Sequence, residues 1–164
     1  MISKKMTTAL NEQINKELYS AYLYLSMSAW SHGRNLKGFA SWFSIQAREE
    51  LGHAMKILQY LEDQGAPVRL LPIDAPTATF ASPTAAFEAT LKHEQFITES
   101  IHKLMAQAVE EKDYATQGLL QWFVSEQVEE EAHSVEIVEK LRLIGEDPRG
   151  LLIVDRELAQ RQAG

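Results

Sequence analysis

Apolar residues recur every three or four positions along four long stretches of the chain, the spacing of helices that bury one face. This pattern predicts helices over about 4–31, 36–63, 83–111 and 114–144. The residues expected on the buried faces are Leu10, Ile14, Ala21, Leu25 and Ser28; Phe39, Phe43, Ile57 and Leu61; Phe87, Leu91, Ile101, Leu104 and Ala108; and Leu120, Val124, Val138 and Leu141. We therefore expect an all-α chain.

The links between these helices set their arrangement. The links 32–35 and 112–113 are short, so the first and second helices, and the third and fourth, should pair antiparallel. The link 64–81 is long and holds Gly65 and three prolines. Eighteen residues, at roughly 3.3 Å each, can run the length of a helix of about 28 residues, roughly 42 Å. The result is a four-helix bundle with one long crossover, over about 4–144.

Two helix starts carry a clear signal. Ser82-Pro83 places a capping side chain before a proline that suits the first helical position. Asp147-Pro148 repeats this signal and predicts a fifth, short helix over about 148–162. The whole chain, 1–164, is expected to form one domain.

Composition and charge narrow the class of protein. The chain has no cysteine, which excludes disulfides, thiolate zinc sites and iron–sulfur clusters, and suits a reducing compartment. Its formal charge of −7 argues against nucleic acid as a partner. Met1–Leu10 lacks the apolar segment of a signal peptide, and no stretch approaches the roughly 18 apolar residues of a membrane span. We expect a cytoplasmic protein without a membrane partner.

A set of polar residues repeats after 77 positions (94 − 17 = 77, and likewise for the other pairs). The pairs are Glu17 and Glu94, Glu49 and Glu126, Glu50 and Gln127, and His53 and Glu130. Each of these side chains can ligate a metal or hydrogen-bond a ligand. Two similar half-sites on two helical hairpins can close around a pair of metal ions.

The repeated residues also project into the core. At about 100° per residue, six side chains lie within about 40° of the centre of an apolar face. They are Glu17, Tyr24, Glu50, His53, Glu94 and Gln127. Glu130 lies at the edge of its face, about 80° away from the centre.

These ligands are expected at one height in the bundle. Glu17 and Glu50 lie 16 and 17 residues from Gly33 in the first turn. Glu94 and Glu130 both lie 18 residues from Lys112 in the second turn. Equal distance from the turn of an antiparallel hairpin means equal height, so the side chains should converge in mid-bundle.

The chemistry of this set favours bound metal. Buried carboxylates close to one another are costly and raise one another's pKa, and cations are the simplest way to hold them ionised. Carboxylate oxygens with one imidazole suit iron or manganese, with zinc as a competitor. Glu50 and His53, three apart, lie on one face of a helix, as in di-iron carboxylate bundles. We predict a dinuclear metal centre.

Several neighbours have two interpretations. Glu131 can be the inward carboxylate in place of Glu130, although the 77-residue repeat favours Glu130. His133 forms a competing motif with Glu130 but projects away from the apolar face, which indicates a surface or cavity histidine. Three acidic residues beside the core face are either solvated charges or further ligands: Glu49, Glu126 and Glu129. Tyr24 is either a core residue or an electron donor to the metals.

Four segments resemble the non-haem ferritins of bacteria and archaea, and the resemblance covers nearly the full chain. They are Leu10–Ser20, Glu49–Ala54, His93–Glu94 and Gln121–Glu131. The resemblance implies a ferroxidase centre, with Glu17, Glu50 and His53 at one iron, Glu50, Glu94 and Glu130 at the other, and Gln127 nearby. It further implies a third iron position near Glu49, Glu126, Glu129 and Glu130.

The resemblance also implies a redox role for Tyr24 and a hollow homo-oligomer of 24 subunits, in which the fifth helix lines fourfold channels. Bacterioferritin-like chains carry a haem-ligating methionine where this chain has Leu51, so we expect no haem. Those chains also carry Glu and His where Gln127 and Glu130 stand. Rubrerythrin-like peroxidases need a cysteine-rich module that is missing here.

The expected function is iron storage with ferroxidase activity. Two Fe²⁺ ions bind side by side, O₂ or peroxide takes their electrons, and the ferric product forms mineral inside the shell. Two alternatives stay open: a bundle whose metal only stabilises the fold, and a di-iron oxidase acting on an organic substrate. The oxidase would need an apolar access pocket, and large residues such as Phe43 and Trp122 give no sign of one.

Overall fold

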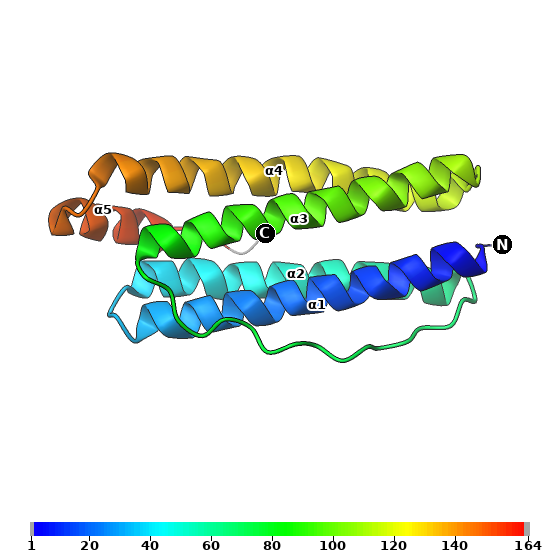
Figure 1. Cartoon of the computed structure of the whole chain (residues 1–164), viewed down its shortest axis with the longest axis horizontal. Coiled ribbons are helices and arrows are strands. Elements are labelled where there is room, and N and C mark those ends of the chain that lie inside the picture. Colours follow the sequence, from blue (N-terminus) through cyan, green and yellow to red (C-terminus); the bar gives the residue numbers. More distant parts are fainter. Residues whose placement is uncertain (1, 163–164) are drawn as a thin grey trace.

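A computed structural model describes residues 2–162. These residues form five helices and the links between them, and none of them lies in a strand. The helices are α1 (Lys4–His32), α2 (Lys37–Asp63), α3 (Pro83–Glu110), α4 (Tyr114–Ile144) and α5 (Pro148–Leu158). Helices α1 and α2 pair side by side, as do α3 and α4, and the two pairs form a four-helix bundle (Figure 1). The predicted all-α bundle with one long crossover and a short fifth helix is confirmed.

The crossover between α2 and α3 runs along the outside of α1 from one end of the bundle to the other (Figure 1). Side chains of α1 hold it at intervals. The Asn11 amide donates to the Pro67 carbonyl (3.0 Å), and its oxygen accepts from the Arg69 amide (2.5 Å). Further along α1, the Ser26 hydroxyl donates to the Thr77 carbonyl (2.7 Å). The long link therefore has a fixed path although it forms no helix.

Most helix starts are capped by a local side chain. Asp147 and Ser82 accept from backbone amides at the starts of α5 and α3, each before a proline, as their sequences predict. Ser3 and Asp113 cap α1 and α4 in the same way. Each such cap contributes about 1 kcal/mol by supplying an acceptor to an amide that has no partner in its own helix.

The start of α2 is capped from outside its own sequence. Leu36 provides no side-chain cap, and Asp155 of α5 accepts instead from the amides of Gly38 (2.8 Å) and Phe39 (3.1 Å). The helices touch closely, since a Cβ added to Gly38 would lie 1.6 Å from the Asp155 carbonyl oxygen. This contact fixes α5 at the end of the bundle.

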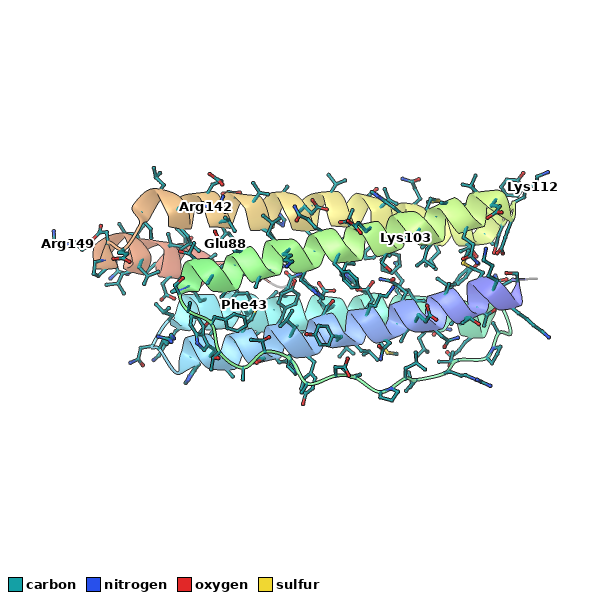
Figure 2. All side chains as sticks on the ribbon, viewed as in Figure 1. Phe43, Glu88, Lys103, Lys112, Arg142 and Arg149 are labelled. Carbon is teal, nitrogen blue, oxygen red and sulfur yellow. The ribbon has the colours of Figure 1, made fainter. Side chains whose placement is uncertain are left out.

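Two apolar clusters occupy the two ends of the bundle interior and leave a polar layer between them. One contains Phe39, Phe43 and Phe87, and the other contains Leu10, Ile57, Ile101 and Leu120. Figure 2 shows Phe43 pointing into the interior, whereas Lys103 and Arg142 lie at the periphery. The polar layer is the predicted level of the metal ligands.

Three details of the predicted helices were wrong. Leu25 is 52% exposed, because the buried face of α1 is centred nearer Tyr24 and Met27, which are fully buried. Ser28 is only half-buried. Leu91 and Val124 are half-buried too, but they pack against the apolar clusters as predicted. Helix α5 ends at Leu158, whereas the predicted end was near 162. The chain forms a turn directly after Leu158. Among the described residues no helix has the length and apolar character to cross a membrane.

Candidate metal centre

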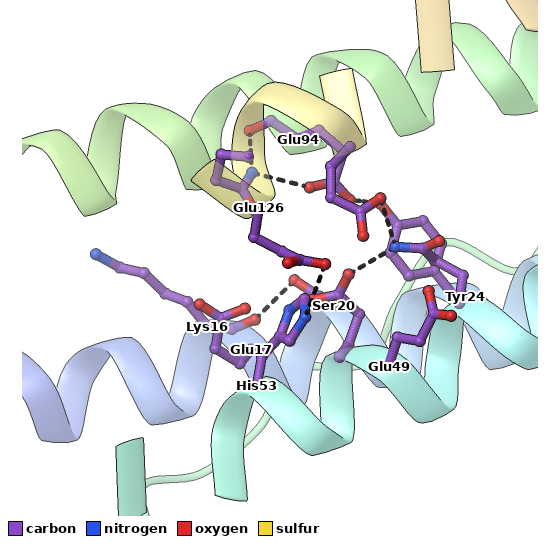
Figure 3. Close-up of polar contacts among 12 residues, drawn as sticks. Lys16, Glu17, Ser20, Tyr24, Glu49, His53, Glu94 and Glu126 are labelled. Atoms are coloured by element: carbon purple, nitrogen blue, oxygen red, sulfur yellow. Dashed lines mark hydrogen bonds and ion pairs between the residues drawn. The ribbon is translucent and has the colours of Figure 1, made fainter. Parts of the chain in front are cut away.

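Six polar side chains from all four helices of the bundle meet in the polar layer. The set comprises Glu17 of α1, Glu50 and His53 of α2, Glu94 of α3, and Gln127 and Glu130 of α4. Each is at most 5% exposed. Figure 3 shows Glu17, His53 and Glu94 directed toward one another from different helices. The structure thus gathers the residues that the 77-residue repeat brings together.

Two groups of candidate ligand atoms share His53. In the first, Glu17, Glu50 and His53 each offer an atom within 4.8 Å of the others. In the second, His53, Glu126 and Glu130 do the same. The Nδ1 atom of His53 lies 3.3 Å from Glu50 Oε2, and its Nε2 atom lies 4.0 Å from Glu126 Oε1. The imidazole therefore stands between two sets of carboxylates.

Glu94 belongs to neither of these groups among the described residues. Its carboxylate accepts from the hydroxyl of Tyr24 and from the amide of Gln127, the latter at 3.1 Å. The second predicted set, Glu50, Glu94 and Glu130, is therefore not gathered as tightly as the first.

Glutamine amides orient the other carboxylates. The Gln13 amide donates to Glu17 Oε1 (2.7 Å). The Gln46 amide donates to both Glu50 Oε1 (2.8 Å) and Glu130 Oε2 (2.9 Å), and so connects α2 with α4. Sequence reasoning missed both glutamines. The available signal was their position four residues before a ligand, on the same helix face.

A hydrogen-bonded chain connects the centre with the surface. Lys16 Nζ donates to Ser100 Oγ (2.6 Å), which donates to Gln13 Oε1 (2.6 Å). Gln13 in turn holds Glu17, so the position of this ligand depends on both α1 and α3. Because the Gln13 amide is neutral, it orients the Glu17 carboxylate without compensating its negative charge.

Two buried oxygen atoms in the layer have no hydrogen-bond partner among residues 2–162. They are Glu17 Oε2 and Gln46 Oε1. An unpaired buried acceptor costs free energy, because it has lost its water without replacement. A cation between Glu17 and Glu50 would satisfy the first of these atoms, and the donor set of carboxylates with one imidazole suits iron.

Burial raises the pKa values of the carboxylates in this layer, so they bind protons more tightly than exposed carboxylates do. Burial, reinforced by the charge of Glu50, raises the pKa of Glu17 to about 8. Burial and the neighbouring charge of Glu94 raise the pKa of Glu130 to about 7. The pKa values of Glu50 and Glu94 are raised for the same first reason, their burial. Binding of cations must therefore displace protons from this layer.

Comparison with known proteins agrees with this geometry. The family model of the ferritin-like domain matches residues 7–144. The chain belongs to the ferritin-like family. A bacterial non-heme ferritin of Campylobacter jejuni is 46% identical over 156 residues, 95% of this chain and 93% of that protein. Another from Escherichia coli O6:H1 is 41% identical, over 97% and 96% of the two chains.

Solved structures of ferritins superpose closely on this chain. A structure described as a novel open pore ferritin from the hyperthermophilic archaeon Archaeoglobus fulgidus has a TM-score of 0.98 and 52% identity. It covers 99% of this chain and is itself covered completely. A humanized archaeal ferritin has a TM-score of 0.99 at 52% identity, with coverage of 100% and 99%. The fold of this ferritin-like chain is thus shared over its full length.

Tyr24 lies against the centre of this ferritin-like chain. It is fully buried, its hydroxyl donates to Glu94 Oε1, and its ring stacks on Phe43 with centroids 6.2 Å apart. Burial, followed by the charge of Glu94, raises the pKa of the Tyr24 phenol well above its usual value. The phenol is therefore neutral and hydrogen-bonded to a candidate ligand, a geometry that suits both interpretations of this residue.

Glu130 is the inward carboxylate of the ferritin-like centre. It is 5% exposed and accepts from Gln46, whereas Glu131 is half-buried and accepts from the Thr98 hydroxyl of α3 (2.5 Å). His133 is exposed, as expected for a surface or cavity histidine. The choice favoured by the 77-residue repeat therefore agrees with the structure.

The outer acidic residues differ from one another. Glu126 is half-buried and points toward His53 (Figure 3). Glu49 is half-buried and pairs with Arg161, a residue that sequence reasoning did not single out. Glu129 is exposed. The structure thus places two of these three carboxylates beside the buried layer and one on the surface.

Trp122 and His93 complete the surroundings. Trp122 is 37% exposed, with its ring edge-on to His53 (centroids 5.4 Å apart) and Lys56 over its face. His93 Nε2 lies 2.7 Å from Ser20 Oγ, and burial lowers the pKa of His93 to about 4. The neutral His93 therefore contributes a hydrogen bond between α3 and α1.

Proposed function

We propose that this chain stores iron and oxidises Fe²⁺ to Fe³⁺ at the buried layer of carboxylates. The observation that carries the proposal is the convergence of four buried glutamates and one histidine from four helices, with one carboxylate oxygen that has no donor among residues 2–162. Relatives named non-heme ferritins support iron as the substrate and the absence of haem. Leu51, exposed on α2, has no atom that could ligate haem.

Each carboxylate has a defined task in this proposal. Glu17, Glu50 and His53 hold the first Fe²⁺, and Glu50, Glu94 and Glu130 hold the second, so that Glu50 bridges the two ions. The negative charge of these groups favours Fe³⁺ over Fe²⁺. Two Fe²⁺ ions give one electron each to O₂, which takes up two protons and leaves as hydrogen peroxide. Peroxide can accept two electrons in the same way and become water.

Oxidation must be followed by storage. We propose a cytoplasmic homo-oligomer of 24 subunits, in whose cavity the ferric product forms mineral. Exposed apolar side chains support association between copies, since Leu152 and Ile153 of α5 are 56% and 59% exposed. A third iron position near Glu49, Glu126, Glu129 and Glu130 would lie on the path from the centre to that cavity.

Replacement of the bridging carboxylate tests the proposal. Glu50→Ala should reduce Fe²⁺ oxidation by O₂ about a hundredfold or more, because both irons lose a ligand. Stopped-flow absorbance with one protein concentration and a series of iron additions measures the rate. Glu62→Ala removes an exposed carboxylate of the same helix and should oxidise iron as the unchanged protein does.

The same variant separates ferroxidase activity from a purely structural metal site. If the metal only stabilises the bundle, Glu50→Ala will alter the melting temperature of the metal-loaded protein and leave the oxidation rate unchanged. That result would overturn the proposal.

A further inference from the structure

The segment after α5 brings the positive charge of Arg161 to Glu49, one of the acidic residues outside the buried layer. Arg161 lies 112 positions from Glu49 in sequence, and its guanidinium pairs with the Glu49 carboxylate. The guanidinium also lies 4.4 Å from the centroid of the Trp42 ring. Both partners belong to α2, so the end of the chain is attached to the helix that carries Glu50 and His53.

This pair differs from the surface ion pairs of the chain. The Arg161 and Glu49 side chains are only 19% and 26% exposed, whereas Lys103 and Glu99 in a typical surface pair are 80% and 71% exposed. The Arg161 Nη1 atom is buried and has no hydrogen-bond partner among the described residues. Pairing of this kind removes two charges from water, and an ion pair with a spare donor has capacity for a further acceptor.

Two further acidic residues of the proposed third position lie beside His53. Glu126 approaches the His53 imidazole to 4.0 Å, and Glu126, Glu130 and His53 each offer a ligand atom within 4.8 Å of the others. The ion pair of Arg161 with Glu49 therefore adds one positive charge to the set of carboxylates at which a third metal ion is proposed.

We infer that Arg161 is the built-in cation of this outer acidic group, and that a metal ion must displace it from Glu49 to occupy the third position. The inference rests on the proposed function, which supplies that position. Because the guanidinium already balances part of the negative charge, it weakens metal binding there. Iron would consequently pass through the outer position instead of accumulating in it.

The surroundings give the displaced side chain a place to go. A groove of about 370 Å³ adjoins Arg161, between α4, α5 and Trp42. Glu136 and Glu157 line the same groove and both pair with Lys140, so a displaced guanidinium would share these carboxylates with that lysine. The exchange would need only a rotation of the Arg161 side chain, with α5 still held by Asp155.

Zinc binding to the metal-free, full-length protein tests the inference without a redox reaction. Isothermal titration would compare the unchanged protein with Arg161→Gln and with Arg156→Gln, which removes an exposed positive charge from the adjoining helix α5. Removal of a nearby positive charge should tighten the weakest zinc site about tenfold. Arg161→Gln should therefore bind a third zinc at concentrations at which the unchanged protein and Arg156→Gln bind two. Arg161→Lys keeps the charge and should stay close to the unchanged protein.

An alternative role for Arg161 is to anchor the end of the chain. In that case Arg161→Gln and Arg161→Ala would lower the melting temperature and leave the affinity of the third zinc unchanged, which would overturn the inference. Failure of the proposed function has a different signature. Glu50→Ala would then oxidise Fe²⁺ as fast as the unchanged protein does, whatever residue stands at 161.

Discussion

At the scale of single residues, the centre is held in shape by neutral amides. Gln13, Gln46 and Gln127 each donate to one or two of the buried glutamates. Neutral donors orient carboxylates without cancelling their charge, so the attraction for a cation is preserved. Partners that orient metal ligands in this way commonly contribute ten- to a hundredfold in metal affinity.

Gln46 allows this to be measured, because its amide spans Glu50 and Glu130. Gln46→Met keeps the volume of the side chain and removes both hydrogen bonds. Anaerobic Fe²⁺ binding should weaken about tenfold. Gln59→Met, at an exposed position of the same helix, is the matched control. Equal affinities in the two variants would show that Gln46 only fills space.

The protonation of Glu17 predicts how stability depends on pH. Its pKa is raised from 4.5 to about 8 in the folded, metal-free chain. Because the folded state holds this proton more tightly than the unfolded state, the stabilising contribution is complete below about pH 4.5 and is lost as the pH rises toward 8.

Glu17→Gln removes this dependence. With a chelator present, the free energy of unfolding of the unchanged protein should fall more steeply between pH 5 and about pH 8 than that of Glu17→Gln. Urea unfolding at several pH values measures both profiles. Glu12→Gln, an exposed change on the same helix, should follow the unchanged protein. Parallel profiles for all three would contradict a raised pKa at Glu17.

The sequence was sufficient to find the residues whose position on a helix decides their role. Glu17, Glu50 and His53 lie within the apolar faces, and the repeat located their counterparts. It was insufficient where the role depends on another helix. Gln46 matters because α4 brings Glu130 to it, and Arg161 matters because the chain turns back after α5. Neither the contact of Gln46 with Glu130 nor that of Arg161 with Glu49 can be predicted from the spacing of residues along one helix.

At the scale of helices, too, the sequence predicts features that depend on one helix and does not predict those that depend on a second helix. The bounds of α1 to α4 differ from the predicted bounds by at most a residue, because apolar spacing and capping residues are local signals. Contacts between helices are not local and leave no such pattern in the sequence. The start of α2 is the clearest example, since its cap is Asp155 of α5.

Asp155→Ala should consequently loosen both helices. Loss of the cap should cost about 1–2 kcal/mol of unfolding free energy. Hydrogen exchange of the Gly38 and Phe39 amides should speed up, since both lose their acceptor. Asp74→Ala, exposed in the crossover, is the control. Unchanged exchange at Gly38 and Phe39 would show that α5 does not cap α2 in solution.

At the scale of the whole molecule, the bundle separates two tasks. The apolar clusters at its ends supply the stability, and the polar layer between them carries strained, partly protonated carboxylates that gain from bound cations. A site of this kind takes up a few metal ions per chain. Storage of many more requires that the oxidised ions leave this site for a cavity, which only an assembly of several chains can enclose.

The buried layer is proposed to oxidise Fe²⁺ and to release the ferric product into the cavity. The most direct test of this proposal is stopped-flow absorbance of the metal-free protein, loaded anaerobically with increasing Fe²⁺ and mixed with O₂. We expect a fast phase that saturates at about two or three irons per chain, followed by slower uptake of many more. Oxidation no faster than in buffer alone would contradict it.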